Sequence, residues 1–186
     1  MNELVFLLEE ASAKALLQEL MPRLVSPEMP IRYIVFEGKQ DLDRQIERRL
    51  QHYRAPDARF VILRDKDMSD CRNLKEEFLA KCENAGRTNA LVRIACHELE
   101  SWYLADLAAV EQGLGIQGLA RKQSQRKFRD PDALANAAQE LSKLTAGRYQ
   151  KVSGSRAIGP HLDLTQTRSK SFSVFINGLK RIIASA

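Results

Sequence analysis

The sequence lacks the features that mark membrane and exported proteins. No apolar run approaches the roughly 18 residues that a transmembrane helix needs. The first ten residues, MNELVFLLEE, carry glutamates where a secretory signal would stay apolar. We therefore expect a cytoplasmic protein with no membrane partner. Internal repeats and low-complexity tracts are missing as well, which argues against solenoid and disordered proteins.

Residues typical of disulfide, zinc or triad chemistry are also scarce. The three cysteines, Cys71, Cys82 and Cys96, show no CxxC spacing, so neither a disulfide framework nor a zinc knuckle is indicated. We expect reduced, partly buried thiols. The three histidines are scattered and form no Ser-His-Asp or Cys-His arrangement. A Walker A motif is missing too, so the chain is not expected to hydrolyse ATP itself.

The size and composition are those of one globular unit. The chain has 186 residues, of which 44% are hydrophobic and 28% charged, and a chain of this size can bury one core. We expect a single domain over residues 1–186. Its α/β core should span about residues 1–112, and a helical and loop-rich C-terminal part, about residues 113–186, should pack on that core.

The hydrophobic pattern predicts alternating strands and helices. Short apolar runs at 4–8, 31–36, 60–63 and 90–96 are typical of buried strands, and amphipathic helical spacing lies between them. Strands separated in this way predict a mostly parallel central sheet flanked by helices. Beyond residue 112 we expect a helix starting at Asp130-Pro131, a polar loop over 147–170 and a closing helix over 172–183.

Three acidic residues follow predicted strands. Glu9 comes after the first strand, and Asp65 and Asp67 come after the third. Alternate residues of an extended segment point the same way, so the two aspartates form a pair. Ligands bind outside the carboxyl ends of parallel strands. Clustered carboxylates there need a cation, and Mg2+, or Mn2+ in its place, prefers such oxygen ligands. An Asp-x-Asp after a strand is also common in solvated loops, and this alternative stays open.

Longer segments carry a family resemblance. LLEEASAKALLQELMPRL, FVILRDKDMSDCRNLKEEF, VRIACHELESWYLADLAAVE, KFRDPD, SGSRAIGPHLD and RSKSFSVF span nearly the whole chain. Together they resemble a bacterial Toprim-like family of unknown function. The Toprim domain is a metal-binding module of topoisomerases, primases and nucleases, with a glutamate after the first strand and Asp-x-Asp after a later one.

The resemblance implies a function and a set of site residues. It assigns catalytic and metal-binding roles to Glu9, Asp65 and Asp67, in an Mg2+-dependent nuclease or related phosphodiester-processing enzyme acting on DNA or RNA. It also implies a bacterial defence or mobile-element effector working beside a separately encoded ATPase. Many Toprim proteins have glycine after the glutamate, but this chain has Glu10, so the choice between Glu9 and Glu10 stays open.

Further acids and an aromatic pair follow the fourth predicted strand. Glu100 is a candidate fourth metal ligand and Glu98 a further acid, although Glu98 equally suits the exposed face of a helix. Trp102-Tyr103 suits base stacking, but an aromatic residue at helical spacing more often fills the core, and we expect the core.

Basic residues predict an anionic partner. Residues 101–186 carry 13 Lys and Arg against 6 Asp and Glu, whereas residues 1–100 carry 16 against 18. Such a bias suits nucleic acid, although it also keeps proteins soluble. The loops 153–156 and 168–171 suit phosphate. The candidate nucleic-acid-binding residues are Lys39, Arg121, Lys122, Arg126, Lys127, Arg129 and Arg156.

Two other functions remain open at this point. A phosphatase of the haloacid dehalogenase type uses an Asp-x-Asp after a strand as nucleophile and acid, but normally after the first strand of its domain. A non-catalytic module that binds nucleic acid or a protein partner is the other alternative, with structural carboxylates. The sequence does not indicate the oligomeric state.

Overall fold

The fold is built on a four-stranded parallel sheet. The computed structural model describes residues 3–66, 70–95 and 98–184. The strands are β1 (Leu4–Leu8), β2 (Ile31–Val35), β3 (Arg59–Asp65) and β4 (Leu91–Ala95), in the order β2-β1-β3-β4. All three pairings are parallel. β1 and β3 lie in the middle of the sheet, which is why their side chains are buried almost throughout.

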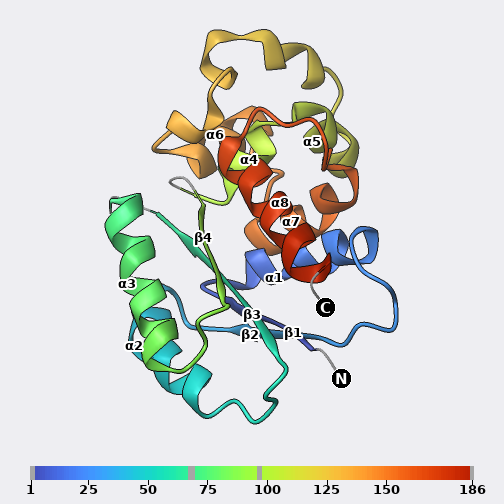
Figure 1. Ribbon diagram of the computed structural model, residues 1–186. Coiled ribbons are helices and arrows are strands. Elements are labelled where there is room, and N and C mark those ends of the chain that lie inside the picture. The colour runs from blue at the N-terminus through green and yellow to red at the C-terminus, as the bar shows by residue number, and fades with distance from the viewer. Residues whose placement is uncertain (1–2, 67–69, 96–97, 185–186) are drawn as a thin grey trace.

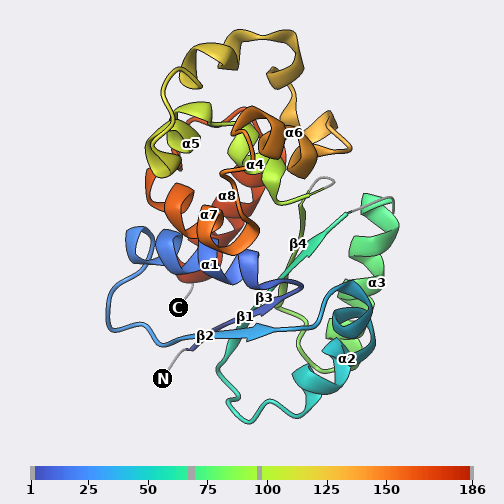
Figure 2. The same cartoon turned by 180° about the vertical axis from the view of Figure 1, so that it is seen from behind.

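Helices cover both faces of the sheet (Figure 1). They are α1 (Ala11–Leu20), α2 (Lys39–Gln51), α3 (Cys71–Asn84), α4 (Glu100–Leu104), α5 (Leu107–Leu114), α6 (Ala137–Leu144), α7 (Lys151–Ile158) and α8 (Lys170–Ala184). Single turns of 3-10 helix occur at Met21–Arg23, Ala120–Ser124, Arg126–Phe128, Pro131–Ala133 and Gly159–His161. α2 and α3 lie on one side of the sheet, and α1, α7 and α8 on the other, as the reverse view also shows (Figure 2).

Alternate residues of each strand supply two separate cores. Val5, Leu7 and Ile62 pack with the apolar faces of α2 and α3, whereas Phe6 and Val61 belong to the larger cluster on the opposite face. That larger cluster includes residues of α1, α4, α5, α6, α7 and α8, so much of the second half of the chain is packed on one face of the sheet. The period of two in the strands produces this division.

The sequence predicted the elements of the sheet well. The strands and the helices between them lie where the apolar pattern places them, and Asp70 caps α3 by accepting hydrogen bonds from the backbone N–H groups of Arg72 and Asn73. Leu79 of that helix is apolar but 39% exposed, because the buried face of α3 consists of Leu74, Phe78 and Cys82.

The C-terminal half differs from its prediction in two places. The polar loop expected over 147–170 is wrong, because α7 occupies Lys151–Ile158. Its Ser-Gly-Ser sequence is a poor helix former, but Gly154 has no side chain and lets the ring of Tyr149 pack against it. The helix expected at Asp130-Pro131 is a single 3-10 turn there, because Leu134 is extended, and the α-helix begins at Ala137.

α5 and α7 approach each other closely at Gly113, and this contact gives a stability prediction. A Cβ on Gly113 would lie 2.5 Å from the carbonyl oxygen of Ala157 and 2.8 Å from the Cα of Ile158. Both are backbone atoms that cannot move alone. We expect Gly113→Ala to destabilise the protein by about 1–3 kcal/mol in urea unfolding. Gln112→Ala, at an exposed position of the same helix, is the control and should change stability little. Equal stability of both variants would contradict the close contact.

The structure confirms the predicted fold class, a mostly parallel α/β sheet flanked by helices with a helical C-terminal part. The division at about residue 112 stays a prediction. None of the helices in the described ranges has the length and apolar character needed to span a bilayer.

Candidate functional site

Three carboxylates from separate segments converge at one edge of the sheet. Glu9 follows β1, Asp65 is the last residue of β3, and Glu100 begins α4 shortly after β4. β1, β3 and β4 are neighbours and run parallel, so their carboxyl ends meet at the same edge. Glu9 is 8% exposed and Glu100 only 2%. Buried carboxylates are uncommon unless paired or bound to a metal.

Glu9 is directed at Asp65. The backbone N–H of Asp65 donates a hydrogen bond of 3.2 Å to Oε2 of Glu9. The same oxygen lies 3.6 Å from Nη1 of Arg64. Backbone bonds also fix the chain here, because the N–H of Gly38 donates to the carbonyl of Glu9. Glu9 is therefore held beside the last residue of β3.

Arg64 contacts both Glu9 and the backbone of Asp65. Its side chain is 4% exposed and pairs with Asp43 of α2, with Nε 3.0 Å from Oδ1 and Nη2 3.2 Å from Oδ2. Nη1 also donates to the backbone carbonyl of Asp65. Such a two-pronged pair fixes the guanidinium in one orientation. The buried guanidinium group of Arg64 thus links α2 to Asp65.

Glu100 is held by a tyrosine from the C-terminal half. The hydroxyl of Tyr149 donates a hydrogen bond of 2.9 Å to Oε1 of Glu100. Burial raises the pKa of Glu100 above its usual value, and this effect exceeds the opposing effect of the Tyr149 hydrogen bond. The pKa of the Tyr149 hydroxyl is raised too, by burial and by Tyr103 and Glu100.

The carboxyl group of Asp65 is strongly perturbed. Its pKa is raised well above the usual value, first by burial and then by the negative charges of Glu9, Glu100 and Glu10. The N–H of Leu99 opposes this by favouring the ionised form. Four acids are therefore close enough to influence one another, which is the environment that a bound cation would relieve.

Glu10 points to a different partner. Its two carboxylate oxygens lie 3.1 and 3.0 Å from Nζ of Lys151, the first residue of α7. Partial burial works against the charge of Lys151, but Glu10, Glu100 and Asp65 outweigh it and raise the pKa of this lysine. A hollow of about 330 Å³ opens here, lined among others by Glu9, Glu10, Gly38 and Lys151. Anionic and cationic groups thus share one open edge.

The donor set fits Mg2+ in its chemistry. Carboxylate oxygens are the ligands that this ion prefers, and it commonly bridges one or two of them to a phosphate. Within residues 3–66, 70–95 and 98–184, no three acidic, histidine or cysteine side chains already surround one point closely enough to hold a metal. Asp67, which the resemblance also implies as a ligand, lies outside the described residues. Its role and those of Glu9, Asp65 and Glu100 remain predictions.

Glu98 caps the N-terminus of α6 in this structure. Its Oε2 accepts a hydrogen bond of 2.8 Å from the backbone N–H of Ala138 in the first turn of α6. A carboxylate at a helix N-terminus stabilises the helix. Glu98 also contributes to raising the pKa of Glu100, so it is close to the site while being engaged by α6.

The predicted basic residues fall into two groups. Lys39 begins α2 directly after Gly38 and lies at the same sheet edge as the acids. The cluster from Arg121 to Arg129 lies in 3-10 turns beyond α5 and α6, away from the sheet in both views (Figures 1 and 2). Lys127 of this cluster pairs with Glu140. The cluster that includes Arg121, Lys122, Arg126, Lys127 and Arg129 is therefore separated from the acidic edge.

The structure differs from the prediction at the two C-terminal segments that were expected to be loops suited to phosphate. Residues 153–156 are part of α7, where Arg156 is exposed. At residues 168–171 the start of α8 is already occupied by a carboxylate of the chain itself. Asp132 accepts hydrogen bonds of 2.7 Å from Oγ of Ser169 and 2.8 Å from the backbone N–H of Ser171. An anion would have to displace it.

This carboxylate gives a second stability prediction. Asp132→Ala leaves the N–H of Ser171 and the hydroxyl of Ser169 without their acceptor. We expect a loss of about 1–3 kcal/mol in the free energy of unfolding. Asp130→Ala, an exposed residue without a side-chain hydrogen bond to its 3-10 turn, should cost much less. If the two variants unfold alike, Asp132 does not anchor α8.

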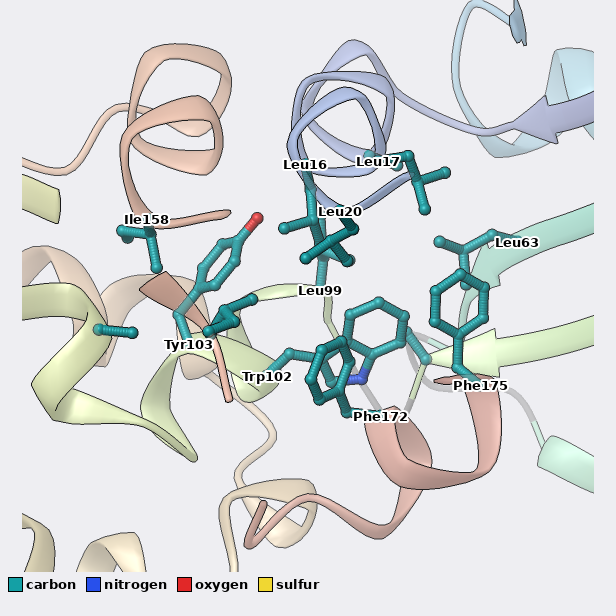
Figure 3. Close-up of a cluster of buried hydrophobic side chains, with 14 of the residues drawn as sticks. Leu16, Leu17, Leu20, Leu63, Leu99, Trp102, Tyr103, Ile158, Phe172 and Phe175 are labelled. Carbon is teal, nitrogen blue, oxygen red and sulfur yellow. The ribbon is translucent and has the colours of Figure 1, made fainter. Parts of the chain in front are cut away.

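Trp102 is a core residue, as expected. It is 1% exposed and lies between Phe172 and Phe175, with ring centroids 5.0 Å from each (Figure 3). Its Nε1 donates to Oγ of Ser171. Tyr103 is fully buried beside it in the chain. Neither ring is available for stacking on a base.

Sequence reasoning missed Arg64, Tyr149 and Lys151. Arg64 directly precedes Asp65, and a charged residue inside an apolar strand is the signal that would have indicated it. No comparable signal exists for Tyr149 and Lys151, because both reach the acids only when α7 folds back against α1. Lys151 and Glu10 are 141 positions apart in the chain.

Comparisons with known proteins agree with this fold. One solved structure, titled "C-terminal region of the Xanthomonas campestris pv. campestris OLD protein phased with iodine", is similar over 98% of this chain and 96% of that chain. The TM-score is 0.51 at 15% sequence identity, which shows a shared fold. No curated protein matches the chain. The family described as "Domain of unknown function (DUF4276)" matches residues 8–180, nearly the whole length, and the chain therefore belongs to that family.

Proposed function

We propose that this protein is a Toprim-like, Mg2+-dependent nuclease or a related phosphodiester-processing enzyme that acts on DNA or RNA. The observation that carries the proposal is the convergence of Glu9, Asp65 and Glu100 at the carboxyl ends of neighbouring strands, where burial, and then the charges of Glu9 and Glu100, raise the pKa of Asp65. A divalent cation would stabilise the ionised form of carboxylates clustered in this way.

Each residue has a role in this proposal. Glu9, Asp65 and Glu100, with Asp67, would hold Mg2+ or Mn2+. The bound ion would supply Lewis acidity toward a phosphoryl oxygen and lower the pKa of a water. Glu9 is alternatively the proton-transfer group. Lys151 and Lys39 place positive charge at the same edge, where a phosphate of the substrate would approach.

The shared fold supports the same class of function. The structural neighbour is the C-terminal region of a protein named OLD. A shared fold is consistent with a shared function but does not establish it. A role as a bacterial defence or mobile-element effector beside a separately encoded ATPase belongs to the proposal as well.

Cleavage assays with the purified protein test the proposal. Labelled DNA and RNA are incubated with Mg2+, with Mn2+ and with EDTA, and a small phosphate monoester is tested in parallel. We expect cleavage of a nucleic acid that depends on the divalent ion. Hydrolysis of the monoester alone would instead favour the phosphatase, and metal-independent binding without turnover would favour a non-catalytic module. Either result would overturn the proposal.

A further inference from the structure

A second concave site lies at the opposite edge of the sheet. A pocket of about 780 Å³ opens at the amino ends of β3 and β4, between the loops that precede them and the last turns of α8. Its described lining includes Arg59, Arg87, Arg93 and Arg181, and Asp57 is the only acidic residue among the lining positions. β3 has seven residues, so the pocket lies about 20 Å from Asp65 at a rise of roughly 3.3 Å per residue.

Two of these arginines hold the walls of the pocket. Nη2 of Arg87 donates to the carbonyl of Tyr53 at 2.8 Å, and its other nitrogens reach the carbonyls of Leu50 and Pro56. These bonds fasten the segment that follows α2. Arg59 donates to the carbonyl of Ile182 in α8. The guanidinium group of Arg87 is therefore fixed at the pocket by backbone oxygens, which carry no net charge.

The other two arginines also donate to backbone oxygens, Arg93 to the carbonyls of Val92 and Val174 and Arg181 to the carbonyl of Asn177, and these bonds likewise leave their charges uncompensated by a carboxylate. Arg93 of β4 is half-buried and lies against Gly178 of α8, where a Cβ would come within 2.8 Å of its Nη2. Glycine inside a helix costs about 1 kcal/mol relative to alanine, and here it leaves space for the guanidinium. Arg181 is exposed one turn further along α8. In the described part of the chain, Arg87, Arg93 and Arg181 form no ion pair with an acidic side chain.

The lining of the pocket carries more positive than negative side chains. Burial lowers the pKa of Arg93, and the nearby charge of Arg181 lowers it further. Four arginines and one carboxylate, Asp57, line the pocket, and a bound anion would relieve the repulsion between the like charges. Guanidinium groups match the oxygens of phosphate in a two-pronged geometry, and a cavity of this size suits a nucleotide-sized ligand.

We propose that the arginine pocket binds phosphate groups through Arg93 and Arg181, supplied by a free nucleotide or by a nucleic-acid strand. The inference goes beyond the acidic site, because the two sites lie at opposite edges of the sheet and share no lining residue. If a strand is the ligand, its backbone is anchored at this pocket independently of any cleavage.

Binding measurements in EDTA test this site without any reaction. Pyrophosphate, a mononucleotide and short single-stranded DNA and RNA are titrated against the full-length protein. We expect binding that weakens as salt increases, and pyrophosphate should compete with whichever nucleotide ligand binds. Binding of the mononucleotide with no binding of the strands identifies a free nucleotide as the source. Binding of the strands identifies nucleic acid, and both results support a phosphate site.

Matched variants locate the site. Arg181→Ala should weaken binding about tenfold, the scale of one charge-assisted hydrogen bond. Lys180→Ala removes the same charge from the adjacent exposed position outside the pocket and should leave affinity nearly unchanged. Arg93→Lys keeps the positive charge but loses the two-pronged geometry of the guanidinium group, so it should also weaken binding. Thermal unfolding verifies that each variant is folded.

Three results would overturn the proposal. One is the lack of binding of every phosphate ligand. Another is an equal effect of Arg181→Ala and Lys180→Ala, which would indicate only general attraction. The third is preferential binding of a polyglutamate peptide over pyrophosphate, which would make the pocket a site for acidic protein segments. Asp65→Asn should not affect binding here, so failure of this site is distinguishable from failure of the acidic one.

Discussion

Asp65→Asn is expected to lower metal-dependent cleavage by about 100- to 1,000-fold, the range for loss of one group that stabilises charge in an active site. Asp65 is the last residue of the central strand β3, and its pKa is raised first by burial and then by the charges of Glu9, Glu100 and Glu10. The amide keeps the shape of the side chain and removes its negative charge. Initial rates at saturating Mg2+ and at a range of Mg2+ concentrations measure the effect.

The control for this variant is Asp130→Asn. Asp130 is exposed and lies in the C-terminal half, outside the acidic edge. Its substitution makes the same chemical change and should leave the rate nearly unchanged. Glu9→Gln should also lower the rate, whereas Glu76→Gln on the exposed face of α3 should not. Wild-type rates in Asp65→Asn would remove this residue from the chemistry.

The same substitution is expected to stabilise the protein when metal is removed. The pKa of Asp65 is raised in the folded state, first by burial and then by neighbouring acids. The folded protein therefore holds a proton on this group over a pH range in which the unfolded chain has lost it. Stability from this group is present below its ordinary pKa of about 3.9 and is lost as the pH rises through the raised value.

Urea unfolding in EDTA at about pH 5 and about pH 8 measures this effect. Asp65→Asn should be more stable than wild type at the higher pH by about 1–3 kcal/mol, the usual scale of the desolvation penalty for a buried polar group. The advantage should shrink as the pH falls, because a lower pH favours protonation of wild-type Asp65, whose pKa is raised by burial. Added Mg2+ should reduce the difference by stabilising only the wild type. A variant that is less stable than wild type at both pH values would contradict the electrostatic account.

The sheet and the acids at its edge could be anticipated from local sequence. Apolar runs of four to seven residues set the strands, and parallel connection brings their carboxyl ends together. Glu9 directly follows β1, and Asp65 is the last residue of β3. The proximity of the two side chains therefore follows from the sheet topology alone. Glu100 needed only the assumption that β4 lies next to β3, which the sheet order bears out.

The C-terminal contribution could not be anticipated in the same way. α7 has low intrinsic helix propensity around Gly154 and depends on packing against α1 and Tyr149. Tyr149 and Lys151 reach Glu100 and Glu10 only through that packing. The arginine pocket depends likewise on α8 lying beside β4. A linear pattern of charge marked residues 121–129 as basic, but it carried no information on which arginines meet in space.

A crystal of the protein soaked in Mn2+ tests the central claim most directly, because anomalous density locates the ion without reference to activity. The account predicts an ion at the carboxyl ends of β1 and β3, in contact with Asp65 and with Glu9 or Glu100. Density only at exposed surface acids, or none at this edge while the protein is folded, would contradict the proposal that these carboxylates form a metal site.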